Sequence, residues 1–185
     1  PFDGINDGIA TSVPQLVDFD DDGDMDLVVA ASIYSFDVYG FINEIQYYRN
    51  DDNIFTQQTG SDNPFDAIES DSRTIPQVVD VDQDGNLDLI LGGLQGLVRY
   101  FRNDGNNNFI QQIGSDNPFD NIDVESSSAP QLIDFDGDED LDLIIGNFDG
   151  RVLYYQNNGN NDFVGQFDEQ SPFDRLELGR GSRPK

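Results

Sequence analysis

The amino-acid sequence predicts an all-β protein rich in turns, because helix formers are scarce while turn and strand formers are plentiful. Of the 37 acidic residues, 31 are Asp and 6 are Glu, whereas Ala occurs five times and Lys once. Asp, Asn and Gly favour turns, and Val, Ile and Phe favour strands. Leu, Ile, Val and Phe supply 54 of the 185 residues, which is enough for a folded core.

Internal repeats organise the whole chain. The tripeptide Pro-Phe-Asp begins at residues 1, 64, 118 and 172, so it recurs after 63, 54 and 54 residues. A Pro-Gln pair followed by two apolar residues and Asp recurs at Pro14, Pro76 and Pro130. Self-similarity of this kind is the signature of a repeat architecture. We divide the chain into repeat 1 (1–63), repeat 2 (64–117), repeat 3 (118–171) and the start of a fourth repeat (172–185).

Each complete repeat has the pattern of four short strands. In the third repeat we expect strands at 129–133, 141–146, 151–156 and 163–167. Asp-Gly and Asn-Gly pairs between apolar runs are strong hairpin signals. We therefore expect β-propeller-type tandem repeats with four short strands per blade, three blades plus the start of a fourth. Three blades are too few to close a propeller, so we interpret the chain as part of a longer protein or as a unit completed by neighbours.

An acidic loop of nine residues separates the first two predicted strands of each repeat. The three loops span 18–26, 80–88 and 134–142, and they hold 15 of the 31 Asp residues. Carboxylates crowded in this way repel one another unless a cation lies among them. The sequence therefore predicts one cation for each loop, about three in the chain.

The spacing within the loop indicates which cation fits. Carboxylates at loop positions 1, 3 and 5 can converge from one tight turn, and Gly at position 6 permits a sharp bend. The carbonyl of position 7 and the acid at position 9 can then complete the shell. All these ligands are oxygen atoms, which favours a hard cation, and a flexible shell of six to eight oxygens favours Ca²⁺ over Mg²⁺.

The acidic loops have two other possible interpretations. An EF-hand shares the first half of the pattern, but it needs a bidentate Glu at position 12 and flanking helices. Position 12 here is Val29, Leu91 or Ile145, inside apolar runs, so an EF-hand is excluded. The other interpretation, acidic surface turns without an ion, stays open, although three loops in register weaken it.

The loops resemble a known family. The pattern Asp-x-Asp-x-Asp-Gly-x-x-Asp-Leu and the segment Gly-Asn-Phe-Asp-Gly at 146–150 are similar to FG-GAP/VCBS-type repeats, the calcium-binding propeller blades related to the integrin α-chain head. The resemblance covers essentially all of residues 1–185. It implies a propeller in which Ca²⁺ ties the first two strands of each blade together. It also implies an extracellular or cell-surface protein, often a bacterial tandem-repeat protein of adhesion or matrix.

The resemblance assigns metal ligands by loop position. The implied side-chain ligands are Asp18, Asp20, Asp22 and Asp26; Asp80, Asp82, Asp84 and Asp88; and Asp134, Asp136, Asp138 and Asp142. The implied carbonyl ligands are those of Asp24, Asn86 and Asp140. One departure is Glu139, which replaces the Gly of position 6. We expect the third site to be the weakest for this reason and Glu139→Gly to tighten it.

Composition excludes several functions. The absence of His and Cys excludes imidazole and thiolate metal sites, Ser-His-Asp triads and disulfides. A formal charge of -28 opposes binding to nucleic acid and to anionic membranes, and no apolar run reaches the roughly 20 residues of a membrane span. Outside the loops, the recurring Asp of Pro-Phe-Asp is interpreted as structural. We therefore expect no catalytic site and no enzyme.

The first repeat carries an aromatic insertion at about 31–41, with Tyr34, Phe36, Tyr39 and Phe41. It is either a longer hairpin folded onto its own blade or a contact site for a neighbour or a glycan. The predicted function is an extracellular, calcium-stabilised repeat scaffold for adhesion, matrix or filament structure. The alternative is a glycan-binding propeller lectin that uses this insertion. Expected partners are neighbouring repeats or identical subunits, with glycans or cell-surface proteins as further candidates.

Overall fold

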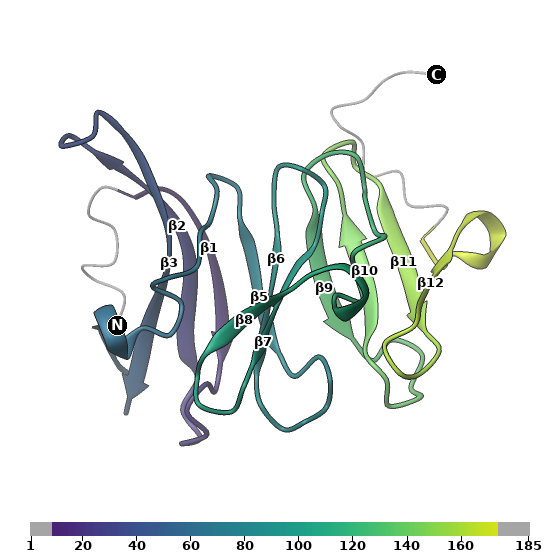
Figure 1. Cartoon of the computed structure of the whole chain (residues 1–185), viewed down its shortest axis with the longest axis horizontal. Helices are drawn as coiled ribbons and strands as arrows, with labels where there is room; N and C mark the ends of the chain where they lie inside the picture. Colours follow the sequence, from purple (N-terminus) through teal and green to yellow (C-terminus); the bar gives the residue numbers. More distant parts are fainter. Residues whose placement is uncertain (1–8, 174–185) are drawn as a thin grey trace.

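The computed structural model describes residues 9–173, which form three four-stranded antiparallel sheets arranged in a row (Figure 1). The first sheet contains β1 (Ile9–Val17), β2 (Asp26–Ser35), β3 (Gly40–Asp51) and β4 (Ile54–Gln58). The second contains β5 (Ile75–Val79), β6 (Asp88–Gly92), β7 (Arg99–Asn103) and β8 (Phe109–Gln112). The third contains β9 (Ala129–Ile133), β10 (Asp142–Gly146), β11 (Val152–Asn157) and β12 (Phe163–Gln166). Strands follow chain order across each sheet.

The acidic loops join the first two strands of each sheet. Each loop is closed by a pair in which the Asp of position 9 lies opposite the last residue of the preceding strand. The pairs are Val17 with Asp26, Val79 with Asp88, and Ile133 with Asp142. The loops are therefore the connections of β-hairpins, and Figure 1 shows all three at the same edge of the row.

The core lies between neighbouring sheets. Strand β6 is buried on both faces, so its run Leu89-Ile90-Leu91 is fully apolar. Leu89 and Leu91 face the first sheet, whereas Ile90 faces the third. Burying each such side chain contributes about 1.5–3 kcal/mol, so the sheets are held together mainly through their faces.

A short segment precedes each later sheet and fills the gap between sheets. Asn63 donates its side-chain N–H to the Ile45 carbonyl at 2.9 Å and accepts the Phe65 amide at 3.1 Å. This fixes Pro-Phe-Asp so that the ring of Phe65 is fully buried against the first sheet. Asn117 and Phe119 repeat the arrangement at the next junction. The recurring Pro-Phe-Asp motif is thus an apolar spacer.

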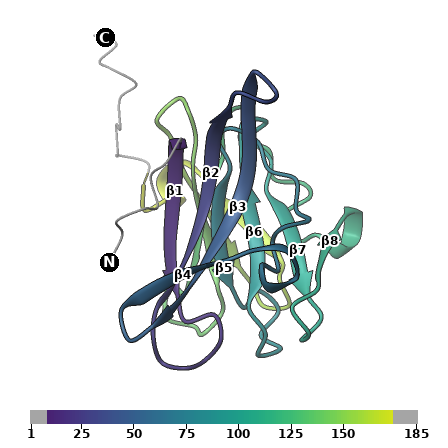
Figure 2. The same cartoon turned by 90° about the vertical axis from the view of Figure 1, so that its left-hand side faces the viewer.

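The predicted aromatic insertion lengthens the β2–β3 hairpin of the first sheet. These strands have 10 and 12 residues, against five residues for β6 and β7. Pairing continues to Ser35 and Gly40, so the extra residues form an extension of the sheet. Figure 2 shows this hairpin rising beyond the neighbouring strands.

The prediction of an all-β protein with four strands per repeat is confirmed. The three sheets form an open row, so the propeller itself stays a prediction. The predicted start of a fourth repeat lies outside the described residues, apart from 172 and 173. The described part of the chain contains short 3₁₀ turns such as Gly60–Asp62, and it has no helix long and apolar enough to span a bilayer.

Candidate metal centre

Each acidic loop gathers three carboxylates around one point. In every group, one oxygen of each residue lies within 4.8 Å of the others. The groups are Asp18, Asp20 and Asp22; Asp80, Asp82 and Asp88; and Asp134, Asp136 and Asp138. Positions 1, 3 and 5 therefore converge in the first and third loops, and positions 1, 3 and 9 converge in the second.

The loop backbone is folded around the carboxylate of position 1. In the second loop, Asp80 accepts the amide of Asp84 at 3.1 Å and that of Gly85 at 2.9 Å. Asp18 accepts the equivalent amides at 3.2 and 3.1 Å. In the third loop, Asp134 accepts the amides of positions 4 and 6 instead. These bonds curl the chain so that its carboxylates point toward one another.

A second hydrogen bond is the same in all three loops. The carboxylate of position 5 accepts the amide of position 7, at 2.9, 2.9 and 3.0 Å. The accepting residues are Asp22, Asp84 and Asp138. Such a bond, in which Asp closes its own turn two residues on, favours the loop conformation without any ion.

Two positions of each loop are left-handed. Position 4 has φ of 59°, 58° and 83°, at Asp21, Gln83 and Gly137. Position 6 has φ of 94°, 91° and 74°, at Gly23, Gly85 and Glu139. Each loop therefore has one Gly and one side-chain-bearing residue at these two positions. The expectation that Glu139 makes the third site the weakest stays a prediction, and the strain at Glu139 is offset by Gly137, which occupies the position that Asp21 and Gln83 have in the other loops.

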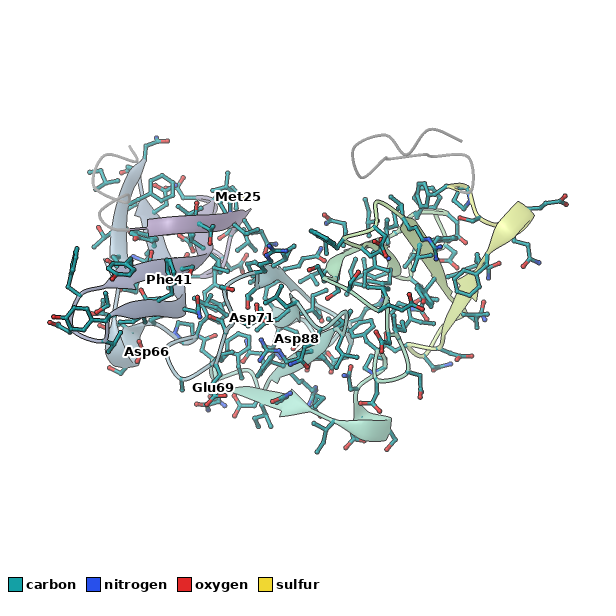
Figure 3. All side chains as sticks on the ribbon, turned by 90° about the horizontal axis from the view of Figure 1, so that it is seen from above. Met25, Phe41, Asp66, Glu69, Asp71 and Asp88 are labelled. Carbon is teal, nitrogen blue, oxygen red and sulfur yellow. The ribbon has the colours of Figure 1, made fainter. Side chains whose placement is uncertain are left out.

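The acid of position 9 is the anchor of each loop. Asp26, Asp88 and Asp142 are fully buried. Asp88 accepts the Tyr100 hydroxyl at 2.9 Å and the Val81 amide at 3.1 Å on Oδ2, and the Asn103 amide at 2.7 Å on Oδ1. Figure 3 shows Asp88 in the middle of the row of sheets. A carboxylate has about four lone-pair positions, so Asp88 retains capacity for a cation.

Two partners of this anchor come from the third strand of each sheet, in the pattern Tyr-x-x-Asn. In the other two loops, the Tyr hydroxyl and the Asn backbone N–H also donate hydrogen bonds to the position 9 carboxylate. The Asn side chain also donates to the carbonyl of position 8, at 3.0, 3.0 and 3.2 Å. Burial, and then the adjacent carboxylate, raises the pKa of Tyr47, Tyr100 and Tyr154, so these hydroxyls remain protonated donors.

The charge that faces each loop differs between repeats. Arg102 forms ion pairs with Asp82 and, at 2.6 Å, with Asp84. The equivalent Arg49 pairs with Asp51, outside the acidic loop. The equivalent residue of the third repeat is Gln156, which donates to Asp136 at 2.6 Å. Within residues 9–173, the second loop is thus the one that has a cationic side chain bonded between its carboxylates.

The pKa shifts follow this difference in charge. Burial, followed by repulsion from Asp26 and Asp22, raises the pKa of Asp20 in the first loop. In the second loop, the Asn86 amide and the Arg102 guanidinium lower the pKa of Asp84. In the first loop, burial and repulsion therefore outweigh the opposing effect of Arg49 on Asp20, whereas Arg102 partly neutralises the second loop.

The donor set fits a hard divalent cation. Every converging atom is a carboxylate oxygen, the ligand type that Ca²⁺ prefers. Asp82 Oδ1 is buried and has no hydrogen-bond partner among the described residues, so one oxygen in the second loop remains available to an ion. The predicted ligand assignment stays a prediction, and Asp84 departs from it by pairing with Arg102.

Sequence reasoning missed the residues that support the loops. The Tyr-x-x-Asn pattern is visible in the sequence at Tyr47, Tyr100 and Tyr154, yet its role in holding the position 9 acid depends on pairing between strands. The sequence also indicated that Gly137 absorbs part of the bend, but the left-handed conformation of position 4 was missed at Asp21 and Gln83. Comparison with protein-family models finds no match, and comparison with curated proteins finds none either.

Proposed function

We propose that this chain is a calcium-stabilised repeat scaffold that acts outside the cell, in adhesion, matrix or filament structure. The observation that carries the proposal is the set of three equivalent acidic loops, each with converging carboxylates at the same edge of the row. A single acidic turn is common on protein surfaces. Three loops with the same position 5 bond and the same buried anchor are best explained by a common ligand.

Calcium fits these loops better than other common cations. The loops offer oxygen ligands from a flexible backbone, and no His or Cys exists in the chain to favour a transition metal. The resemblance to FG-GAP/VCBS-type repeats supports the same ion. Extracellular modules bind Ca²⁺ with dissociation constants of about 10⁻⁴ to 10⁻³ M, which suits the millimolar Ca²⁺ outside cells.

Calcium-dependent stability tests this proposal. Because an ion that binds only the folded chain stabilises it by mass action, we expect about 2.7 kcal/mol per site at a hundredfold excess over the dissociation constant. The measurement is the melting temperature in Ca²⁺, in Mg²⁺ and after exhaustive chelation. The control replaces position 3 in all loops, as Asp20→Asn, Asp82→Asn and Asp136→Asn, and it should lose the gain. Equal melting temperatures of the unmodified chain in Ca²⁺ and chelator would refute the proposal.

A second candidate function is glycan binding by the β2–β3 hairpin. Phe36 and Tyr39 are 77% and 85% exposed, and Tyr34 contacts Phe36 edge-on with ring centroids 5.2 Å apart. Phe41 lies in the same hairpin, on the sheet at one end of the row (Figure 3). Exposed aromatic groups of this kind often mark recognition surfaces. A glycan array probed with the intact chain and with Tyr39→Ala tests it, since a pure scaffold binds no sugar specifically.

A further inference from the structure

Neighbouring sheets are joined by a side-chain clamp that the Pro-Gln motif provides. Gln15 accepts the Val78 amide at 2.6 Å through Oε1 and donates to the Val78 carbonyl at 3.0 Å through Nε2. Gln77 makes the same two bonds to Leu132, at 2.6 and 2.9 Å. One Gln therefore pairs like a short piece of strand with the first strand of the next sheet.

The equivalent Gln of the third repeat has no such partner in the part of the chain that the structure describes. Gln131 is exposed, and no hydrogen bond of its amide occurs within residues 9–173. It lies one repeat after Gln77, which is 8% exposed and doubly bonded. The third sheet thus has the Gln of the clamp, but the described residues do not include a next strand for it to bond.

The apolar face around Gln131 is open in the same way. Ile133 and Phe135 are 46% and 43% exposed, whereas Val81, the equivalent of Phe135, is 3% exposed. Ile144 is half-buried, but its equivalent Ile90 is fully buried against the third sheet. We call this surface, formed by Gln131, Ile133, Phe135, Ile144 and Gly146, the open face of the third sheet.

Gly146 leaves space on the open face, and the equivalent space on the second sheet is filled by the next repeat. A Cβ atom on the equivalent Gly92 would lie 2.3 Å from Pro130 and from the Ser128 carbonyl, so the second sheet requires glycine where the third repeat packs. The first sheet has Ala30 at this position. Among the described residues, a Cβ on Gly146 would meet only Ala129, at 3.8 Å. The third sheet therefore has room for an incoming proline that nothing described here fills.

An aromatic spacer is already seated beside the open face. The ring of Phe173 lies 5.4 Å from that of Phe135 and 6.2 Å from that of Tyr154. Phe65 sits between the first two sheets in the same way, 5.5 Å from Phe19 and 6.3 Å from Tyr47. In that established interface the next repeat covers the Phe with Phe109, at 5.0 Å.

We infer that the open face of the third sheet docks a further β-repeat of this same type. The occupant presents the backbone N–H and C=O of its first strand to Gln131, its Pro to Gly146 and an outer-strand Phe to Phe173. The established interfaces between the first and second and between the second and third sheets supply the geometry, because both use the Gln clamp and a buried Phe at equivalent positions. The contact of Pro with Gly is taken from the interface of the second and third sheets. This inference goes beyond metal binding and rests only on contacts between sheets.

An extended chain tests the inference. Pro184 lies one 54-residue period after Pro130, so a copy of residues 76–117 is joined in place of 184–185, with its Pro76 at that position. The melting temperature and hydrogen exchange of the original and extended chains are measured at one Ca²⁺ concentration. Gln131→Ala is made in both chains, and Gln77→Ala serves as the matched control for an occupied clamp.

We expect Gln77→Ala to lower the melting temperature of both chains by about 4–8 °C, because two hydrogen bonds are lost. Gln131→Ala should change the melting temperature of the original chain by less than about 1 °C. In the extended chain it should destabilise the appended repeat by an amount similar to the effect of Gln77→Ala. Gly146→Val should likewise leave the melting temperature of the original chain unchanged, and it should prevent the appended repeat from docking in the extended chain. Two results would overturn the inference. One is unprotected amide hydrogen exchange throughout the appended repeat, and the other is an unchanged stability of the extended chain when it carries Gln131→Ala.

Self-association provides a separate outcome. Sedimentation of the original chain should show a monomer over the concentrations used. Dimers that Gln131→Ala abolishes would identify a second copy as the occupant and overturn the assignment to a further repeat in the same chain.

Discussion

The second and third acidic loops have the same fold but different means of reducing strain and charge. Both bond position 5 to the amide of position 7, and both bury the acid of position 9. The second loop has Gly at position 6 and Gln at position 4, whereas the third has Glu and Gly at these positions. One glycine in either place is compatible with the loop, so the hydrogen bonds define the turn and the glycine only lowers its cost.

The charges around the two loops differ more than their backbones. Arg102 pairs with two carboxylates of the second loop, while the third loop has the neutral Gln156 at the same place. An internal guanidinium and a bound divalent cation would compete for the same oxygens. The hydrogen bonds therefore determine the loop conformation, and the facing charges are expected to determine its affinity for an ion. A variant can change one of these properties without the other.

The largest effect is expected when the buried anchor is removed. Asp88→Ala leaves the Tyr100 hydroxyl and the amides of Val81 and Asn103 without an acceptor. We expect a loss of about 3–5 kcal/mol in the free energy of unfolding, even in chelator, measured with denaturant. Asp142→Ala should cost a similar amount. A loss below about 1 kcal/mol would show that the anchor does not hold the loop.

A smaller effect is expected from exchanging the residues that face the loops. Arg102→Gln removes the competing cation, so the second loop should bind Ca²⁺ about five- to tenfold more tightly. Gln156→Arg should weaken the third loop by a similar factor. Calcium titration at low salt, where charge effects are least screened, measures both changes. Equal affinities in the parent and both variants would mean that Arg102 moves away from the loop without cost.

The smallest effect concerns the left-handed positions. Glu139→Gly and Asp21→Gly each relieve a non-glycine residue at positive φ, so each should stabilise the chain by about 1 kcal/mol. Both remove one negative charge, and Glu139→Gln with Asp21→Asn controls for that loss. Gly137→Ala should destabilise by a similar amount, because an added Cβ meets no neighbour and only backbone strain changes. No difference between the glycine variants and the charge controls would rule out strain at these positions.

The features that local pattern determines were predictable from the sequence. Alternation and turn residues gave four strands per repeat, and the Asp spacing identified carboxylates that do converge, such as Asp18, Asp20 and Asp22. Period and turn chemistry act over a few residues, so no knowledge of distant contacts was needed.

The features that depend on distant partners were not predictable. The clamp of Gln15 joins residues 63 positions apart, and the anchor Asp88 depends on Tyr100 of another strand. Arg102 was not recognised as a loop residue because its approach to Asp82 requires the pairing of β6 with β7. The positive φ of loop position 4 was not predicted at Asp21 and Gln83, because Asp and Gln do not require this conformation.

The most direct test of the central claim is the number of Ca²⁺ ions that the folded chain binds. Equilibrium dialysis against millimolar Ca²⁺, followed by elemental analysis, gives this number without relying on stability. We expect about three ions per chain, and one fewer for each loop that carries an Asp→Asn change at position 3, such as Asp136→Asn. No bound Ca²⁺, or a number that the loop variants leave unchanged, would contradict the assignment of these loops as metal sites.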